Sequence, residues 1–192
     1  CRVFSNYGII LKNLGKLNEA EICQRKAIKL NPNYPPAYCN LSNILIDSGN
    51  LKEAEILIRK AIEIQPDMAI AYYNLGLIMR DIGNLKEAEI STRKAIEFQP
   101  DMATAYYNLG LIIRDKGNLK DAEISIREAI KINPMYAEAH NTLGIIFKET
   151  GKLNEAENST RKAIEINPMY AEAHNTLGNI FREIGKLKEA EN

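Results

Sequence analysis

The sequence predicts an all-α protein, a solenoid of tandem 34-residue helix–turn–helix repeats. Two columns of residues carry this prediction. Prolines recur every 34 residues, at Pro32, Pro66, Pro100, Pro134 and Pro168. Glycines recur with the same spacing, at Gly15, Gly49, Gly83, Gly117, Gly151 and Gly185. Because such columns leave no room for insertions, we expect one array over residues 1–192, with repeats 1–34, 35–68, 69–102, 103–136, 137–170 and a partial 171–192.

Residues 67–100 illustrate the first helix of a repeat. Asp67 follows Pro66, and we expect its side chain to cap the new helix. Gly83 should end this helix, because glycine adopts the left-handed conformation without strain. An apolar stripe recurs between them at three- and four-residue steps, at Ala71, Tyr72, Leu75, Ile78 and Met79.

The second helix begins at Asn84, followed three residues later by Glu87, a spacing that resembles a capping box. Pro100 ends the repeat, since its ring disfavours helix at Gln99. A second apolar stripe contains Leu85, Ala88, Ile96 and Phe98. One hairpin cannot bury both stripes, so neighbouring repeats should stack around a continuous core. Small residues at Gly8, Ser42, Gly76, Gly110, Gly144 and Gly178, and at Ala20 and its equivalents, should let the two helices approach closely.

Composition excludes several classes of function. The chain has 25 basic and 25 acidic residues, a balance that argues against nucleic-acid binding. No uncharged apolar run approaches ~18 residues, so no membrane span is expected. Three cysteines without zinc spacing fit a reducing, cytoplasmic compartment. Without a nucleophile–His–acid set, a phosphate loop or a two-His metal helix, we expect no enzyme, cofactor or metal site.

The repeat carries a family resemblance. Tyr72, Leu75-Gly76, Ala88, Ala95 and Pro100 form a motif that resembles the tetratricopeptide repeat. The resemblance implies a right-handed α-α superhelix whose first helices line a concave groove for a protein or peptide ligand. Two local departures are His140 and His174, which replace an aromatic residue and are interpreted as packing residues rather than metal ligands.

An asparagine column on the first helices is the leading candidate site, at Asn6, Asn40, Asn74 and Asn108. An amide can both donate to and accept from a peptide backbone, so one amide per repeat suits an extended ligand. The column is similar to the asparagine ladder in the repeat region of O-linked N-acetylglucosaminyl transferases. The alternative is that these side chains bond to neighbouring first helices and fix the stacking.

The third and fourth repeats add an aromatic and basic surface, formed by Tyr73, Tyr107, Leu77, Leu111, Arg80 and Arg114. Tyrosine and arginine often anchor interfaces. Two alternatives stay open: the tyrosines pack between first helices, and the arginines form ion pairs between repeats. Asn141 and Asn175 make the last repeats more polar. The column that contains Leu77 also contains Ile9, Asn43, Ile145 and Asn179.

The sequence therefore predicts a protein-interaction scaffold that binds an extended peptide or a partner helix. One alternative is the substrate-recruiting arm of a larger transferase, such as a glycosyl- or sulfotransferase. Another is a self-assembling array that associates through uncapped apolar ends. Because Cys1 stands directly at the start of a first helix and Asn192 a few residues into a second helix, we expect a piece of a longer array.

Overall fold

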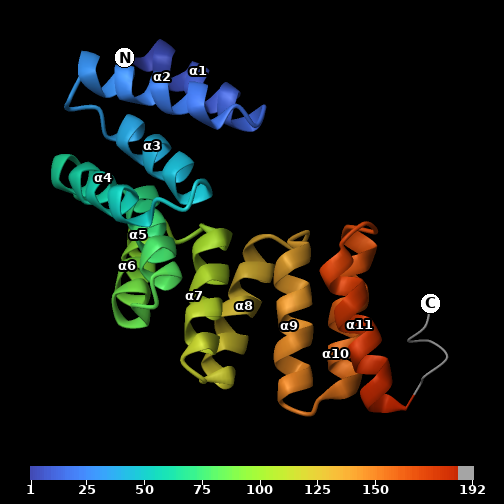
Figure 1. Cartoon of the computed structure of the whole chain (residues 1–192). Coiled ribbons are helices and arrows are strands. Elements are labelled where there is room, and N and C mark those ends of the chain that lie inside the picture. Colours follow the sequence, from blue (N-terminus) through green and yellow to red (C-terminus); the bar gives the residue numbers. More distant parts are fainter. Residues whose placement is uncertain (186–192) are drawn as a thin grey trace. The chain divides into compact units, whose positions relative to one another are not determined.

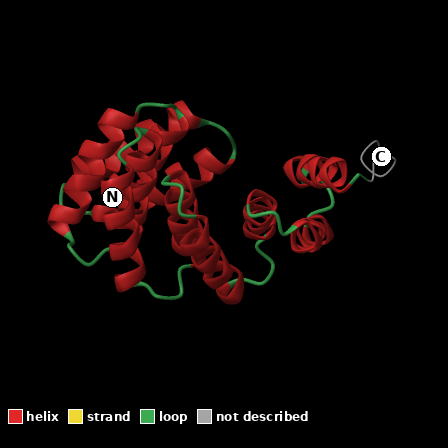
Figure 2. Cartoon of the chain, turned by 90° about the horizontal axis from the view of Figure 1, so that it is seen from below, coloured by secondary structure: helices red, strands yellow, loops and turns green. Residues whose placement is uncertain are grey.

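The structure is a computed structural model that describes residues 1–185. These residues form eleven α-helices joined by short turns and contain no strand (Figure 2). The expected start of the last second helix, at residues 186–192, lies outside the described residues. The helices are α1 (Arg2–Asn13), α2 (Leu17–Leu30), α3 (Pro35–Asp47), α4 (Leu51–Ile64), α5 (Ala69–Asp81), α6 (Leu85–Phe98), α7 (Ala103–Asp115), α8 (Leu119–Ile132), α9 (Ala137–Glu149), α10 (Leu153–Ile166) and α11 (Ala171–Ile184).

The helices pack as hairpins, as the 34-residue repeat predicts. Each first helix (odd number) packs on the second helix (even number) that follows it, from α1 with α2 to α9 with α10. Within each compact unit described below, second helices also pack on the next first helix, as α2 does on α3 and α10 on α11. Figure 1 shows α9 and α11 side by side, and these two first helices are in contact.

The chain divides into two compact units, Cys1–Pro100 and Asp101–Asn192. The N-terminal unit contains α1 to α6, and the C-terminal unit contains α7 to α11. Each unit is a stack of the same hairpin, so the first helices of each one form a face of their own.

The turn between the two helices forms as the sequence predicts. Gly83 has a φ of 82° and donates its N–H to the Arg80 carbonyl at 2.9 Å. The Asn84 N–H donates to the Met79 carbonyl at 2.8 Å, which closes the end of α5. Asn84 then caps α6, since its Oδ1 accepts from the Glu87 N–H. The full capping box does not form: the Glu87 carboxylate accepts from the Asn84 side-chain amide, because the Asn84 backbone N–H is already used.

The expected cap at Asp67 is wrong. Helix α5 begins at Ala69, with Met68 in the capping position and no side-chain cap. The Met68 N–H donates to the Gln65 carbonyl at 3.3 Å, which closes a turn around Asp67. Asp67 therefore lies inside this turn, one residue too early to reach the free amides of α5.

The small-residue columns let the helices of a hairpin approach, as expected. A Cβ on Gly110 would lie 2.5 Å from Ile126 Cδ1, so only glycine fits without displacing that side chain. Ser42 is the exception in this column, and its hydroxyl donates to the Ala54 carbonyl at 3.1 Å. The facing alanines are fully buried, at Ala20, Ala54, Ala88, Ala122 and Ala156.

Candidate functional site

The asparagine column lies deeper than an exposed ligand-binding ladder would. Asn74 and Asn108 are each 1% exposed, whereas Asn6 is exposed and Asn40 is half-buried. Asn40 Nδ2 donates to Ser5 Oγ at 3.0 Å, from α3 to α1. After Asn108, the column continues with threonine instead of asparagine, at Thr142. These positions favour the alternative in which the column stabilises the stacking of first helices.

The column one residue earlier, which contains Cys39, Tyr73 and Tyr107, also packs between helices. Thr142 Oγ1 donates to the Tyr107 hydroxyl at 3.3 Å, and the Tyr107 ring lies 5.0 Å from that of Tyr136. Cys39, the equivalent residue in α3, is buried, and this burial raises the pKa of its thiol to about 12. Tyr73 and Tyr107 are both half-buried. Tyr107 therefore contributes to packing within its unit, which is the alternative that the sequence left open.

The two asparagines predicted as site residues in the last two repeats, Asn141 and Asn175, differ in exposure. Asn141 is buried and forms a hydrogen bond with the Tyr170 side chain, whereas Asn175 is exposed. Burial raises the pKa of Tyr170, and the bond from Asn141 opposes this shift. Of these two amides, only Asn175 presents its surface to solvent.

Basic residues on the first helices form ion pairs with the next repeat. Arg114 binds Glu149 through two bonds, from Nη2 at 2.9 Å and from Nε at 3.2 Å. The same step of 35 residues joins Lys12 to Asp47 at 3.0 Å and Lys148 to Glu183 at 3.3 Å. The ion-pair alternative is therefore correct for Arg114. Arg80 is half-exposed in α5.

Two hollows open on the first-helix faces, one in each unit. The N-terminal hollow has a volume of about 160 Å³, and Ile9, Lys12, Asn40 and Asn43 lie in its wall. The C-terminal hollow, of about 280 Å³, lies among α7, α9 and α11, and is lined by Arg114, Ile145, Lys148, Glu149, Thr176 and Asn179.

The column that contains Leu77 and Leu111 contributes residues to both hollows. Ile9 and Asn43 line the N-terminal hollow, and Ile145 and Asn179 line the C-terminal one. Leu77 and Leu111 themselves are half-buried. The 34-residue spacing identifies this column in the sequence. It does not show which members border open space, because that depends on the side chains of the facing repeat. A joint surface of Tyr73, Leu77, Tyr107 and Leu111 stays a prediction, because these residues belong to different units.

The repeat pattern, the hairpins and the small-residue columns agree with one family. The pattern described as a tetratricopeptide repeat matches residues 2–34, 35–68, 69–102 and 103–135, and a TPR repeat pattern matches residues 146–185. The chain belongs to the tetratricopeptide repeat family.

Several solved structures share this fold. MamA is 26% identical with a TM-score of 0.71, over 85% of this chain and 96% of MamA. PilW, a type IV pilus biogenesis factor, is 18% identical with a TM-score of 0.91, over 99% and 88%. YrrB, a TPR protein with an unusual peptide-binding site, is 22% identical with a TM-score of 0.66, over 88% of each chain. The search of curated proteins finds no match.

The two histidines take over the packing position of the family aromatic. In α3, the Tyr38 hydroxyl donates to the Pro32 carbonyl at 2.9 Å. His140 Nε2 lies 3.0 Å from the Pro134 carbonyl, and His174 Nε2 lies 2.9 Å from the Pro168 carbonyl. The described residues contain no group of three or more His, Cys, Asp or Glu side chains placed to hold a metal. No helix in the same part of the chain combines the length and apolar character of a membrane span.

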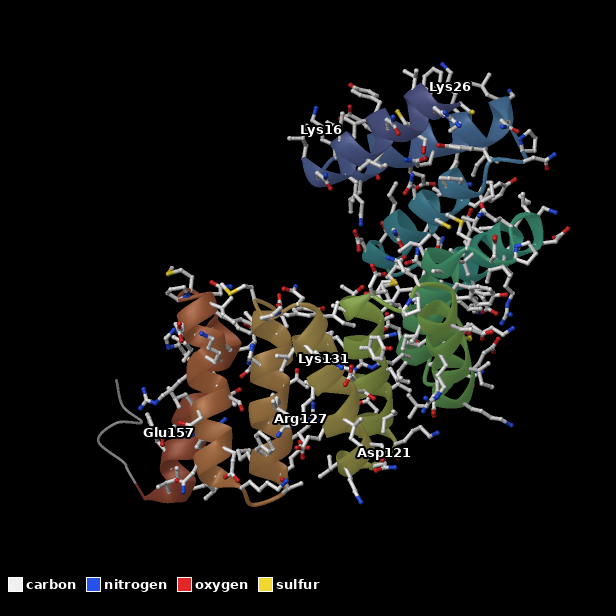
Figure 3. The ribbon with its side chains drawn as sticks, turned by 180° about the vertical axis from the view of Figure 1, so that it is seen from behind. Lys16, Lys26, Asp121, Arg127, Lys131 and Glu157 are labelled. Carbon is white, nitrogen blue, oxygen red and sulfur yellow. The ribbon has the colours of Figure 1, made fainter. Side chains whose placement is uncertain are left out.

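The second-helix sides also contain hollows, of about 400 and 380 Å³. They are larger than the first-helix hollows. The two occupy equivalent positions two repeats apart, since Tyr72 lines one and the equivalent residue His140 lines the other. Charged residues line them: Arg127 and Lys131, labelled on α8 in Figure 3, border the hollow of about 380 Å³. Arg59 on α4 and Glu87 on α6 both line the larger hollow and form a salt bridge with each other, so its charged groups are already paired across second helices. The first-helix faces are therefore the better candidates for a ligand.

Proposed function

We propose that this protein is an interaction scaffold that binds an extended peptide on the first-helix face of each compact unit. Members of the tetratricopeptide repeat family generally mediate protein–protein interactions. One observation carries the finer proposal: the hollow among α7, α9 and α11 combines an apolar side chain, an amide and charged groups in Ile145, Asn179, Lys148 and Glu149. Such a mixture suits the side chains and backbone of a peptide.

Geometry favours an extended ligand over a helix. Packed helices lie about 10 Å apart, and an extended chain advances about 3.3 Å per residue. About three ligand residues would therefore cover one repeat, with one side chain entering each hollow. A helical ligand has a diameter of about 10–12 Å, which is wide for a hollow of about 280 Å³.

Substituting Ile145 by lysine should weaken peptide binding to the C-terminal unit. The change places a charge beside Lys148 and removes the apolar wall. We expect affinity for peptides selected from a random library to fall about tenfold or more, as for other central interface residues. Fluorescence titration measures this effect. Ile124→Lys is the matched control, because Ile124 is exposed on the second helix α8; equal losses in both variants would contradict the proposal.

A second candidate, self-association, is favoured by the outer face of α1. Val3 is 79% exposed and Ile10 is 54% exposed, and Tyr7 and Leu14 extend this surface. The equivalent residues in α3 are buried, at Ala37, Leu41 and Ile44. A contiguous apolar surface of this kind marks an interaction site.

Ile10→Lys should therefore lower the average mass of the protein in concentrated solution. Light scattering over a dilution series measures this mass. If the wild-type protein stays monomeric at every concentration, α1 is not a self-association face. If the variant and the wild type associate equally, association uses another surface.

A further inference from the structure

The hollow between α1 and α3 contains a buried amide with an unused acceptor. Gln24, on α2, is fully buried and forms part of the wall. Its Nε2 donates to the Ser5 carbonyl at 2.8 Å, and its Oε1 has no hydrogen-bond partner. This bond fixes the orientation of the amide, because an oxygen cannot bond to the Ser5 oxygen. A buried acceptor without a donor is costly and uncommon, so the Oε1 atom needs an explanation.

The amide is particular to the first repeat. The same column holds Ile58, Thr92, Ile126 and Thr160 in the other repeats. Gly8 makes room for the longer side chain, since a Cβ on Gly8 would lie 2.6 Å from Gln24 Nε2. Gly8 and Gln24 both line the hollow, so the buried Gln24 side chain forms part of the wall of a site on the first-helix face.

Neighbouring side chains complete a neutral polar site. Asn40 donates to Ser5 Oγ through Nδ2, which leaves its Oδ1 as a second acceptor. Asn43 is half-buried in the same wall and carries an amide that can donate. Lys12 is neutralised by Asp47 at 3.0 Å. The hollow therefore offers acceptors and a donor without a net charge.

We propose that this hollow, the Gln24 pocket, binds a neutral primary carboxamide: the side chain of a glutamine or asparagine in a peptide held on the N-terminal unit. The ligand NH₂ donates to Gln24 Oε1, and its carbonyl accepts from Asn43. A carboxylate would face the Gln24 oxygen without a proton to share, and an ammonium group would find no carboxylate among the residues that line the hollow. The volume of about 160 Å³ equals roughly five waters at about 30 Å³ each, enough for a carboxamide and its stem.

This inference extends the proposed peptide binding, and small probes test it separately. The probe is N-acetyl-glutamine methylamide, compared with the glutamate, lysine and norleucine analogues, in NMR titrations of the labelled protein. We expect the glutamine probe to bind about fivefold to tenfold more tightly than norleucine, the equivalent of one hydrogen bond. The side-chain amide signals of Asn40 and Asn43 should shift on binding.

Gln24→Ile should remove this preference. Isoleucine is fully buried at the equivalent positions Ile58 and Ile126, so the fold accepts it. Gln24→Thr introduces the residue type that stands at Thr92 in the same column, and this second variant should show the same loss.

Two outcomes overturn the inference. If the four probes bind equally, or none produces a saturable shift, the pocket holds only water. If Gln24→Ile keeps the preference, the acceptor lies elsewhere. Neither outcome affects the peptide hollow among α7, α9 and α11, whose test with Ile145→Lys is separate. Conversely, probe binding at the Gln24 pocket without any peptide binding would contradict the proposed function alone.

Discussion

Replacing Ala122 with leucine is expected to lower the free energy of unfolding by about 1–3 kcal/mol, the usual cost of overpacking. Ala122 is fully buried at the crossing of α7 and α8. Its carbonyl oxygen lies 3.4 Å from where a Cβ on Gly110 would stand, so the two backbones are already close. A leucine side chain has no room there, and the helices must separate.

Urea denaturation measures this loss, with Lys120→Leu as the control. Lys120 is exposed on the same helix, and surface changes of this kind alter stability by about 0.5 kcal/mol or less. Comparable losses in the two variants would show that α8 does not present Ala122 to α7.

Amide hydrogen exchange should vary strongly along each unit, with the largest contrast between neighbouring first helices. In α1 only Ser5, Gly8 and Leu11 are buried, whereas α3 has eight buried residues. In the C-terminal unit, α11 has four buried residues and α9 has eight. Because local opening follows the number of packed contacts, we expect α1 and α11 to exchange about a hundredfold faster than α3 and α9.

Mass spectrometry of exchanged peptides measures these rates at low protein concentration. Dilution matters because self-association through α1 would protect that helix. Uniform protection of α1 and α3 in a monomeric sample would contradict the view that each repeat is stabilised mainly by its neighbours.

The fold could be predicted almost entirely from the sequence, because each column has a local physical cause. Gly83 and Pro100 end helices through backbone geometry, and the glycine at 110 is required by contact within one hairpin. Asp67 is the exception: the turn from Gln65 to Met68 places Asp67 one residue before the capping position, which Met68 occupies. Such a one-residue offset depends on backbone angles that the residue types do not determine.

The candidate site was harder to predict, because it depends on contacts between repeats. Residues three apart on a helix lie on nearly the same face, so the sequence alone does not separate Asn74 from Leu77, although the two side chains have different environments. Asn74 is buried between neighbours, and Leu77 is half-buried. The sequence places both on the first helix. Only the facing helix decides which one a ligand can reach, and the Gln24 acceptor depends in the same way on Gly8 and Ser5.

The most direct test of the central claim is an NMR map of a library-selected peptide on the wild-type protein. The claim is that ligands bind the first-helix faces. We predict chemical-shift changes at Ile145, Lys148 and Asn179, which line the C-terminal hollow, while the second-helix residue Ile124 stays unchanged. Changes confined to the second helices, around the hollow that contains Lys131 and Lys162, would contradict the claim and place the ligand on the opposite side.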